Sequence, residues 1–119
     1  PGVPQVYYGG LFACENDMEL LAKTNVGRDI NRPYLNADKI SESLDKPVVK
    51  GLIELIKIRN EHPAFSGEFS AQGEGGMCCL TWQLGEQSIS LSVDFEARTA
   101  LITQVNGDEE TSISLDSLL

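Results

Sequence analysis

The side chains best suited to metal binding or proton transfer in this 119-residue chain are three cysteines and one histidine, namely Cys14, Cys78, Cys79 and His62. A zinc site needs about four such ligands at recognisable spacing, and the chain contains no Cys-x-x-Cys pair. His62 stands where a helix is expected to end before Pro63, a position that favours a solvated imidazole over a general base. We therefore expect no metal, no cofactor and no histidine-based catalytic centre.

The run Gly27–Arg32 carries a different chemistry, because Arg28 and Arg32 lie on either side of Asp29. A guanidinium offers several N–H donors in a fixed plane and stays charged, so Arg28 can bind neighbouring hydroxyl oxygens without changing its protonation. Gly27 lets the backbone turn sharply beside it. For Asp29 and Arg32 we expect a local ion pair that shapes the loop, and the alternative role for Arg28 is an ion pair with Asp29 or another carboxylate.

Composition and charge exclude several classes of partner. The formal net charge is −9 and the isoelectric point is near 4.4, so the chain would repel phosphate backbones and anionic lipid. No apolar run approaches the roughly 18 residues that span a bilayer, and no export signal follows Pro1. Cys78 and Cys79 would point to opposite faces of a strand, which favours reduced thiols. We expect a cytoplasmic protein that binds neither nucleic acid nor membranes.

The elements that would position Arg28 begin with a short strand from Gly2 to Tyr8. Its almost continuous apolar residues are typical of a parallel strand buried on both faces. Two glycines end the strand, and its two tyrosines are expected in the core rather than stacked on a ligand. A long loop follows, with a short helix at Asp17 to Lys23, and loops of that length usually carry function.

Two more helices are expected before the chain changes character. Asn36 can cap a short helix that runs to Leu44. Asp45 and Pro47 start the main helix, which should continue to about His62 and end before the proline that follows it. The apolar residues of this helix cover more than one stripe, so we expect a broad buried face against a sheet. Its solvent-exposed face is expected to carry Lys50, Glu54, Lys57 and Glu61.

From Gly67 onward the hydrophobic period becomes 2, which is typical of antiparallel strands with one buried face. Turn signals divide this part into five strands near 67–73, 77–84, 87–95, 98–105 and 110–115. The core is expected to contain Leu80, Trp82, Leu84, Ile89, Leu91 and Val93, with a carbohydrate-binding patch around Trp82 as the less favoured alternative. The domain boundary is predicted near Ser66, which gives domains 1–66 and 67–119.

Several motifs resemble one enzyme family. The opening Gly2-Val3-Pro4-Gln5-Val6-Tyr7-Tyr8-Gly9 is similar to the eighth barrel strand of the α-amylase superfamily. Within that superfamily the chain resembles the sucrose phosphorylases through Asn16–Leu21, Gly27–Arg32, Pro47-Val48-Val49 and Arg59-Asn60. The resemblance is dense over about residues 1 to 70, and it implies an α+β fragment. That fragment would be the last βα unit of a (β/α)₈ TIM barrel, with its other strands outside this chain, followed by a small antiparallel β-domain.

The resemblance also implies a reaction. Sucrose phosphorylases are retaining enzymes that transfer a glucosyl group from sucrose to phosphate through a covalent intermediate on a carboxylate. Their catalytic carboxylates come from earlier barrel strands, and Asp17, Glu19 and Asp29 do not match those motifs. This chain is therefore expected to hold no catalytic residue and to be inactive alone. Arg28 matches the family's arginine that binds the glucosyl ring in the donor subsite, so it is the expected substrate-binding residue.

Two features leave alternatives open. Pro33 and Leu35 stand where the family pattern has His and Tyr, which leaves the acceptor and leaving group undecided. The expected partners are sucrose or another glucosyl donor and phosphate in the intact enzyme, together with a homodimer formed by sheet pairing. The rival hypothesis is a stand-alone β-domain that binds a partner without catalysis.

Overall fold

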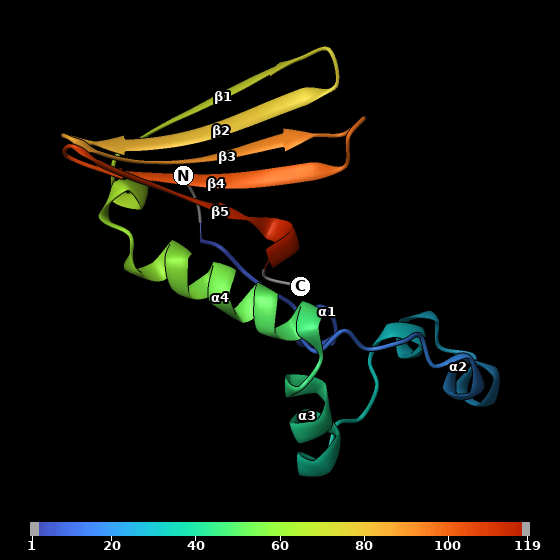
Figure 1. Cartoon of the computed structure of the whole chain (residues 1–119). Helices are drawn as coiled ribbons and strands as arrows, with labels where there is room; N and C mark the ends of the chain where they lie inside the picture. Colours follow the sequence, from blue (N-terminus) through green and yellow to red (C-terminus); the bar gives the residue numbers. More distant parts are fainter. Residues whose placement is uncertain (1–2, 118–119) are drawn as a thin grey trace. The chain divides into compact units, whose positions relative to one another are not determined.

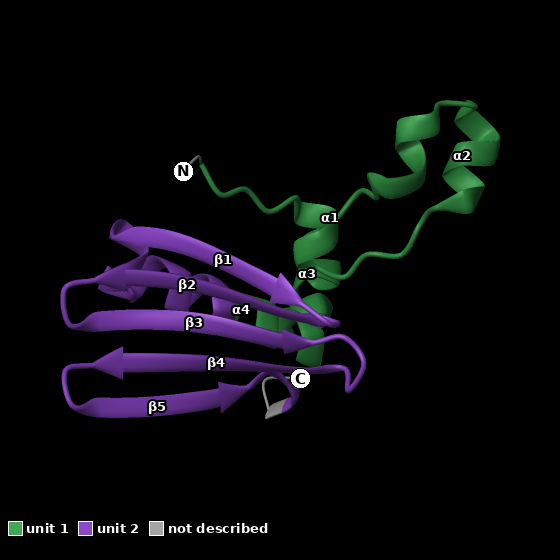
Figure 2. Cartoon of the chain, turned by 90° about the horizontal axis from the view of Figure 1, so that it is seen from above, with its two compact units in different colours: residues 1–53 green, residues 54–119 purple. Residues whose placement is uncertain are grey.

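The computed structural model describes residues 3–117 of a chain that divides into two compact units, residues 1–53 and residues 54–119. Figure 2 shows the first unit, which is helical and irregular, and the second, which is built around one sheet. The longest helix, α4 (Pro47–Glu61), supplies residues to both units. Among the helices in residues 3–117, none is both long and apolar enough to cross a membrane.

The predicted N-terminal strand is wrong over its described residues. Residues 3–7 have no regular structure, and a short helix α1 (Tyr8–Leu11) follows them, while Gly2 lies outside the described residues. An extended segment needs a neighbouring strand to satisfy its backbone groups, and the five strands of the sheet pair only with one another. The two tyrosines are therefore exposed and not in a core, with Tyr7 at 45% and Tyr8 at 39%. The barrel βα unit stays a prediction.

The helices predicted in the first unit are confirmed. Helix α2 (Met18–Thr24) begins after Asp17, whose side chain accepts a hydrogen bond from the Leu20 N–H at 2.8 Å. It ends at Asn25, which adopts the left-handed conformation that closes many helices. A 3₁₀ helix η1 (Gly27–Asn31) follows. Helix α3 (Ala37–Leu44) is capped by Asn36, which accepts from the Lys39 N–H at 2.9 Å.

Helix α4 begins and ends as predicted. Pro47 occupies its first position, where the missing N–H costs nothing. The four positions predicted to face solvent are all exposed. Within the second unit, Leu55 and Ile58 pack against the buried core of the sheet. The apolar face is narrower than predicted at its start, because Val48 is 49% exposed. The part of α4 from Glu54 onward thus supplies one side of the second unit's core.

The predicted antiparallel sheet is confirmed, and every predicted strand boundary lies within one residue of the observed one. Five strands pair in sequence order, β1-β2-β3-β4-β5, all antiparallel (Figure 1). Gly75, Gly76, Gly85 and Gly107 adopt positive φ in the hairpin turns. The strand bounds are β1 Glu68–Glu74, β2 Met77–Leu84, β3 Gln87–Asp94, β4 Thr99–Asn106 and β5 Glu109–Ser114.

The core of the second unit lies on one face of this sheet. Ala64, Ile89 and Ile102 are 0%, 3% and 5% exposed. The ring of Trp82 lies with its centroid 4.8 Å from that of Phe65, which belongs to the 3₁₀ helix η2 (Pro63–Ser66). The predicted core set is therefore on the correct face, except that Leu84 at the strand end is 43% exposed. The domain boundary near Ser66 stays a prediction.

Candidate functional site

Most of the Gly27–Arg32 loop forms the 3₁₀ helix η1, which follows helix α2 in the chain. Thr24 at the end of α2 links the two, because its hydroxyl donates to Leu20 O at 3.0 Å and accepts from the Val26 N–H at 3.3 Å. The Asp29 N–H then donates to Val26 O at 2.9 Å and closes the first turn of η1. These local bonds fix the backbone on either side of Arg28.

Three longer-range hydrogen bonds hold the second half of the loop and Pro33, the residue that follows it. The backbone N–H of Asp17 donates to Ile30 O at 2.7 Å. The Tyr7 hydroxyl donates to Asn31 O at 3.1 Å, and the Tyr8 hydroxyl donates to Pro33 O at 3.3 Å. Hydrogen bonding with the Tyr7 side chain is the largest cause that raises the pKa of Tyr8, whose hydroxyl is protonated at neutral pH even at its ordinary pKa. The side chains of Tyr7 and Tyr8 in the N-terminal segment thus hold this part of the backbone in place.

Arg28 itself is exposed, and its guanidinium has no hydrogen-bond or ion-pair partner within residues 3–117. The predicted ion pair between Asp29 and Arg32 is wrong, and so is the alternative pair between Arg28 and Asp29, because neither is found in this part of the chain. Arg32 has left the helical geometry, with φ −123° and ψ 60°. An exposed pair contributes too little, about 0–1 kcal/mol, to bring the side chain back. The donors of Arg28 therefore remain available to a ligand.

Gly9 provides a test of how the N-terminal segment supports the loop. A methyl group at Gly9 would lie 2.8 Å from Tyr7 Cε1 and 3.3 Å from Asn31 O, whereas one at Gly10 would meet nothing within 4 Å. We expect Gly9→Ala to displace the Tyr7 ring and break its bond to Asn31. Amide signals of residues 27–31 in a ¹H–¹⁵N spectrum should shift strongly in this variant.

Gly10→Ala is the matched control, since it adds the same methyl group one residue further along the same short helix. A helical Gly→Ala change with free space stabilises by about 0.5–1 kcal/mol, so this variant should fold normally. Equal shifts of the loop amides in both variants would show that Tyr7 does not support the loop.

A hollow of about 270 Å³ lies elsewhere in the first unit and does not include Arg28. Pro33 and Leu35, the two departures from the family pattern, line it together with Lys39 and Lys46. The Lys46 ammonium donates to the carbonyl oxygens of Phe12 and Ala13 at 3.3 and 3.1 Å, so it stabilises the turn that follows helix α1. The structure therefore does not bring these departures together with Arg28 in one pocket.

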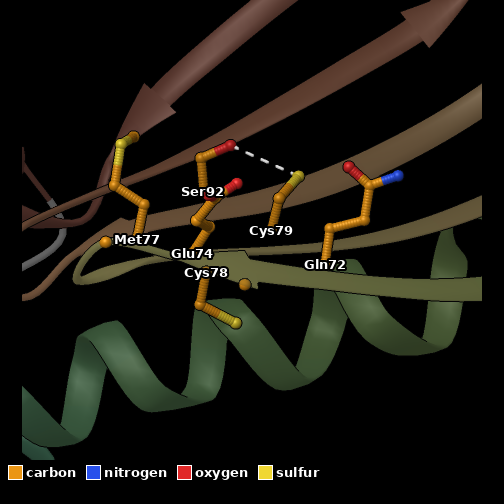
Figure 3. Close-up of a pocket in the computed structure, with 8 residues that line it drawn as sticks. Gln72, Glu74, Met77, Cys78, Cys79 and Ser92 are labelled. Atoms are coloured by element: carbon orange, nitrogen blue, oxygen red, sulfur yellow. Dashed lines mark hydrogen bonds between the residues drawn. The ribbon is translucent and has the colours of Figure 1, made fainter.

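The cysteines do not form a metal centre. All three are free, and within residues 3–117 no group of three or more His, Cys, Asp or Glu side chains could hold a metal ion. Figure 3 shows Cys79 and Cys78 pointing to opposite sides of β2, as predicted. Cys79 faces a hollow of about 550 Å³ and accepts a hydrogen bond from the Ser92 hydroxyl at 3.6 Å. Cys79 is half-buried, and these contacts are not those of a metal ligand.

His62 has a role that the sequence analysis missed. It is half-buried, and its Nδ1 accepts from the Ala64 N–H at 3.3 Å, so it caps η2 rather than standing in solvent. The available signal was the His-Pro pair, because proline favours the first position of a helix and the residue before it is the N-cap. Trp82, the alternative carbohydrate-binding residue, lies between Phe65 and Phe69 with ring centroids 4.8 Å away on each side.

Comparisons with known proteins place these observations in a family context. No model of a protein family matches the chain. It is 49% identical over 104 residues to a sucrose phosphorylase of Agrobacterium vitis, covering 87% of this chain and 21% of that protein. It is 41% identical over 111 residues to a sucrose 6(F)-phosphate phosphorylase of Thermoanaerobacterium thermosaccharolyticum, covering 92% of this chain and 23% of that protein. The chain thus spans about a fifth of the length of these relatives.

Two further comparisons add to these. A glucosylglycerol phosphorylase of Marinobacter adhaerens is 38% identical over 104 residues, which cover 87% of this chain and 22% of that protein. The crystal structure of a sucrose 6F-phosphate phosphorylase from Thermoanaerobacter thermosaccharolyticum superimposes with a TM-score of 0.89 at 40% identity. The superposition covers 96% of this chain and 24% of that one, so the fold described here matches a known one over nearly its whole length.

Proposed function

Because this chain is homologous to the C-terminal portion of sucrose phosphorylases, we propose that it serves as part of a phosphorylase that transfers a glucosyl group to phosphate. Its own contribution would be one arm of the donor subsite, carried by Arg28, together with a β-domain that stabilises the protein. The identity of 41% over 92% of this chain supports the proposal.

The proposed reaction is a double displacement with retention at the glucosyl carbon. A carboxylate would attack that carbon, an acid would protonate the leaving oxygen, and phosphate would then take the glucosyl group from the covalent intermediate. Both carboxyl groups would come from outside this chain, about 5–5.5 Å apart. The residues of this chain would take no part in bond making and would bind and orient the sugar.

The state of Arg28 is the observation that carries the proposal. Its guanidinium is exposed and unpaired within residues 3–117, while the loop around it is held by hydrogen bonds from Asp17, Tyr7 and Tyr8. Because hydrogen bonds already order the backbone of the loop, binding has to order only the Arg28 side chain, which favours a ligand-binding role. Such a guanidinium can donate to two adjacent hydroxyl oxygens of a sugar ring at once.

The names of the relatives are consistent with a role on the donor side. They are phosphorylases of sucrose, of sucrose 6(F)-phosphate and of glucosylglycerol, three compounds that share a glucosyl group and differ in what is attached to it. A residue that binds the shared glucosyl group can be common to all three. The acceptor and leaving group for this chain are left open, as Pro33 and Leu35 already indicated.

A stand-alone binding module is the second candidate, because residues 54–119 form a compact unit with its own buried core. In that case the chain would bind a partner without catalysis. The edge strands β1 and β5 each pair on one side only, which is what sheet pairing between two copies would require. A homodimer of this kind stays a prediction.

Enzyme assays separate the two candidates. The purified 119-residue chain, incubated with sucrose and phosphate, should release no glucose 1-phosphate, whereas the longer protein that carries this sequence should release it at rates of about 1–10³ per second. A coupled assay for glucose 1-phosphate measures both. Activity of the short chain alone would refute the proposed division of labour, and an inactive longer protein would favour the binding module.

A further inference from the structure

At one end of the sheet, the face that holds the core changes from apolar to polar. Leu91, Ile102 and Ile113 form an apolar row across β3, β4 and β5. The next row on the same face is Ile89, Gln104 and Thr111, and the last row is Gln87, Asn106 and Glu109. Side chains alternate between the two faces of a strand, so these polar residues stand where the pattern calls for apolar ones. Such departures from local rules occur at functional sites.

The polar end of this face forms a pocket of about 270 Å³. Pro63, the first residue of the 3₁₀ helix η2, and His62, its N-cap, line the pocket together with residues of the polar rows. All of its lining residues belong to the second unit. The residues that line the pocket are His62, Pro63, Gln87, Gln104, Asn106, Glu109 and Thr111. It is just below the range of about 300–1,000 Å³ typical of drug-sized ligands, which fits a smaller molecule.

Several hydrogen-bonding groups in this pocket remain unused. Gln104 is half-buried, and its side chain has no hydrogen-bond partner within the described residues. The Gln87 Nε2 donates to Asn106 Oδ1 at 3.1 Å, which leaves the Gln87 oxygen to accept and the Asn106 amide to donate. His62 Nδ1 accepts from the Ala64 N–H, so its Nε2 carries the proton and can donate. No buried side-chain nitrogen or oxygen among the described residues lacks a partner, so these unused groups reach the surface and can bond to a ligand.

We propose that this pocket binds a small neutral polyhydroxy compound, a sugar of one or two rings. Each hydroxyl of such a ligand both donates and accepts, and the amide, imidazole and hydroxyl groups of the pocket offer both functions at short spacing. Glu109 is the one charged side chain among the lining residues, so an anionic sugar phosphate would be repelled. The lining residues of this site belong to the second unit and Arg28 belongs to the first, and the proposal does not depend on the proposed function.

A titration of the ¹⁵N-labelled 119-residue chain with D-glucose and with sucrose tests the proposal. The side-chain NH₂ signals of Gln87, Gln104 and Asn106 should shift and saturate, with half-saturation on the order of 1 mM. Glucose 6-phosphate should bind at least about tenfold more weakly, since it brings a negative charge next to Glu109. Signals that drift linearly without saturation, or that shift elsewhere in the chain, would overturn the proposal.

Variants locate the binding. Gln104→Leu keeps the size of the side chain and removes its polar groups, so it should weaken binding about tenfold while the fold is retained. Gln72→Leu is the matched control, because Gln72 lies exposed on edge strand β1 and lines a different hollow. The proposal fails if both variants bind alike. If Gln104→Leu unfolds the unit, Asn106→Ala, at an exposed position, gives the same comparison.

Discussion

Under the proposed function, replacing Arg28 with alanine in the longer protein that carries this chain is expected to lower kcat/KM for the glucosyl donor by about 10²–10⁴-fold. Two hydrogen bonds from a charged donor contribute about 1.5–3 kcal/mol each. Each 1.36 kcal/mol lost from transition-state binding lowers the rate constant tenfold. Steady-state kinetics with sucrose as the varied substrate measures the effect.

Two variants sharpen this test. Arg28→Lys keeps the charge and loses the planar pair of donors, so its kcat/KM should fall between those of the native enzyme and Arg28→Ala. Arg98→Ala removes another exposed guanidinium, from the turn between β3 and β4, and should leave kcat/KM unchanged. If Arg28→Ala and Arg98→Ala have equal effects, Arg28 has no place in the donor subsite.

Replacing Ile102 with alanine is expected to lower the free energy of unfolding of the β-sheet unit by about 2–5 kcal/mol. Ile102 is 5% exposed and belongs to the buried cluster with Ala64 and Ile89, so its loss leaves a cavity under the sheet. Trp82, the one tryptophan of the chain, packs against this cluster and reports unfolding by its fluorescence in urea. The urea midpoint should fall without a change in slope.

Leu101→Ala is the matched control, because Leu101 is the preceding residue of β4 and points to the opposite face. It is 41% exposed, so its truncation should cost about 0.5 kcal/mol. The two substitutions remove the same number of carbon atoms, and only their environments differ. A similar loss of stability for both would mean that the buried face of the sheet has been assigned wrongly.

The sheet could be predicted almost to the residue, whereas the N-terminal segment could not. Strand β3 alternates apolar and polar residues along its length, and three of the four hairpin turns carry glycines with positive φ, while Arg98 adopts that conformation in the fourth. Both signals are local and they agree. The segment before Gly9 also has the composition of a buried strand, but a strand forms only when a neighbour completes its hydrogen bonds. The residues of the segment do not determine whether such a neighbouring strand is present.

In the candidate site, too, features that depend on nearby residues could be predicted, and contacts between distant residues could not. The motif Gly27–Arg32 indicated Arg28 through its resemblance to a family, and the structure then placed that side chain in solvent without a partner within residues 3–117. Sequence reasoning did not find the hydrogen bonds from Tyr7 and Tyr8 to the loop, because they join residues 24 and 25 positions apart. It expected an ion pair of Asp29 and Arg32 that their backbone geometry does not bring together.

The sequence alone determined the order of the main helices and strands from α2 to β5, the turns that set the register of the sheet and the family to which the chain is homologous, since each depends on residues close together in the chain. The tertiary structure decided which groups meet: the tyrosine hydroxyls with the arginine loop, and the polar rows that line a pocket beside His62. The physical reason is that such contacts depend on how distant segments pack, and no local pattern encodes that distance.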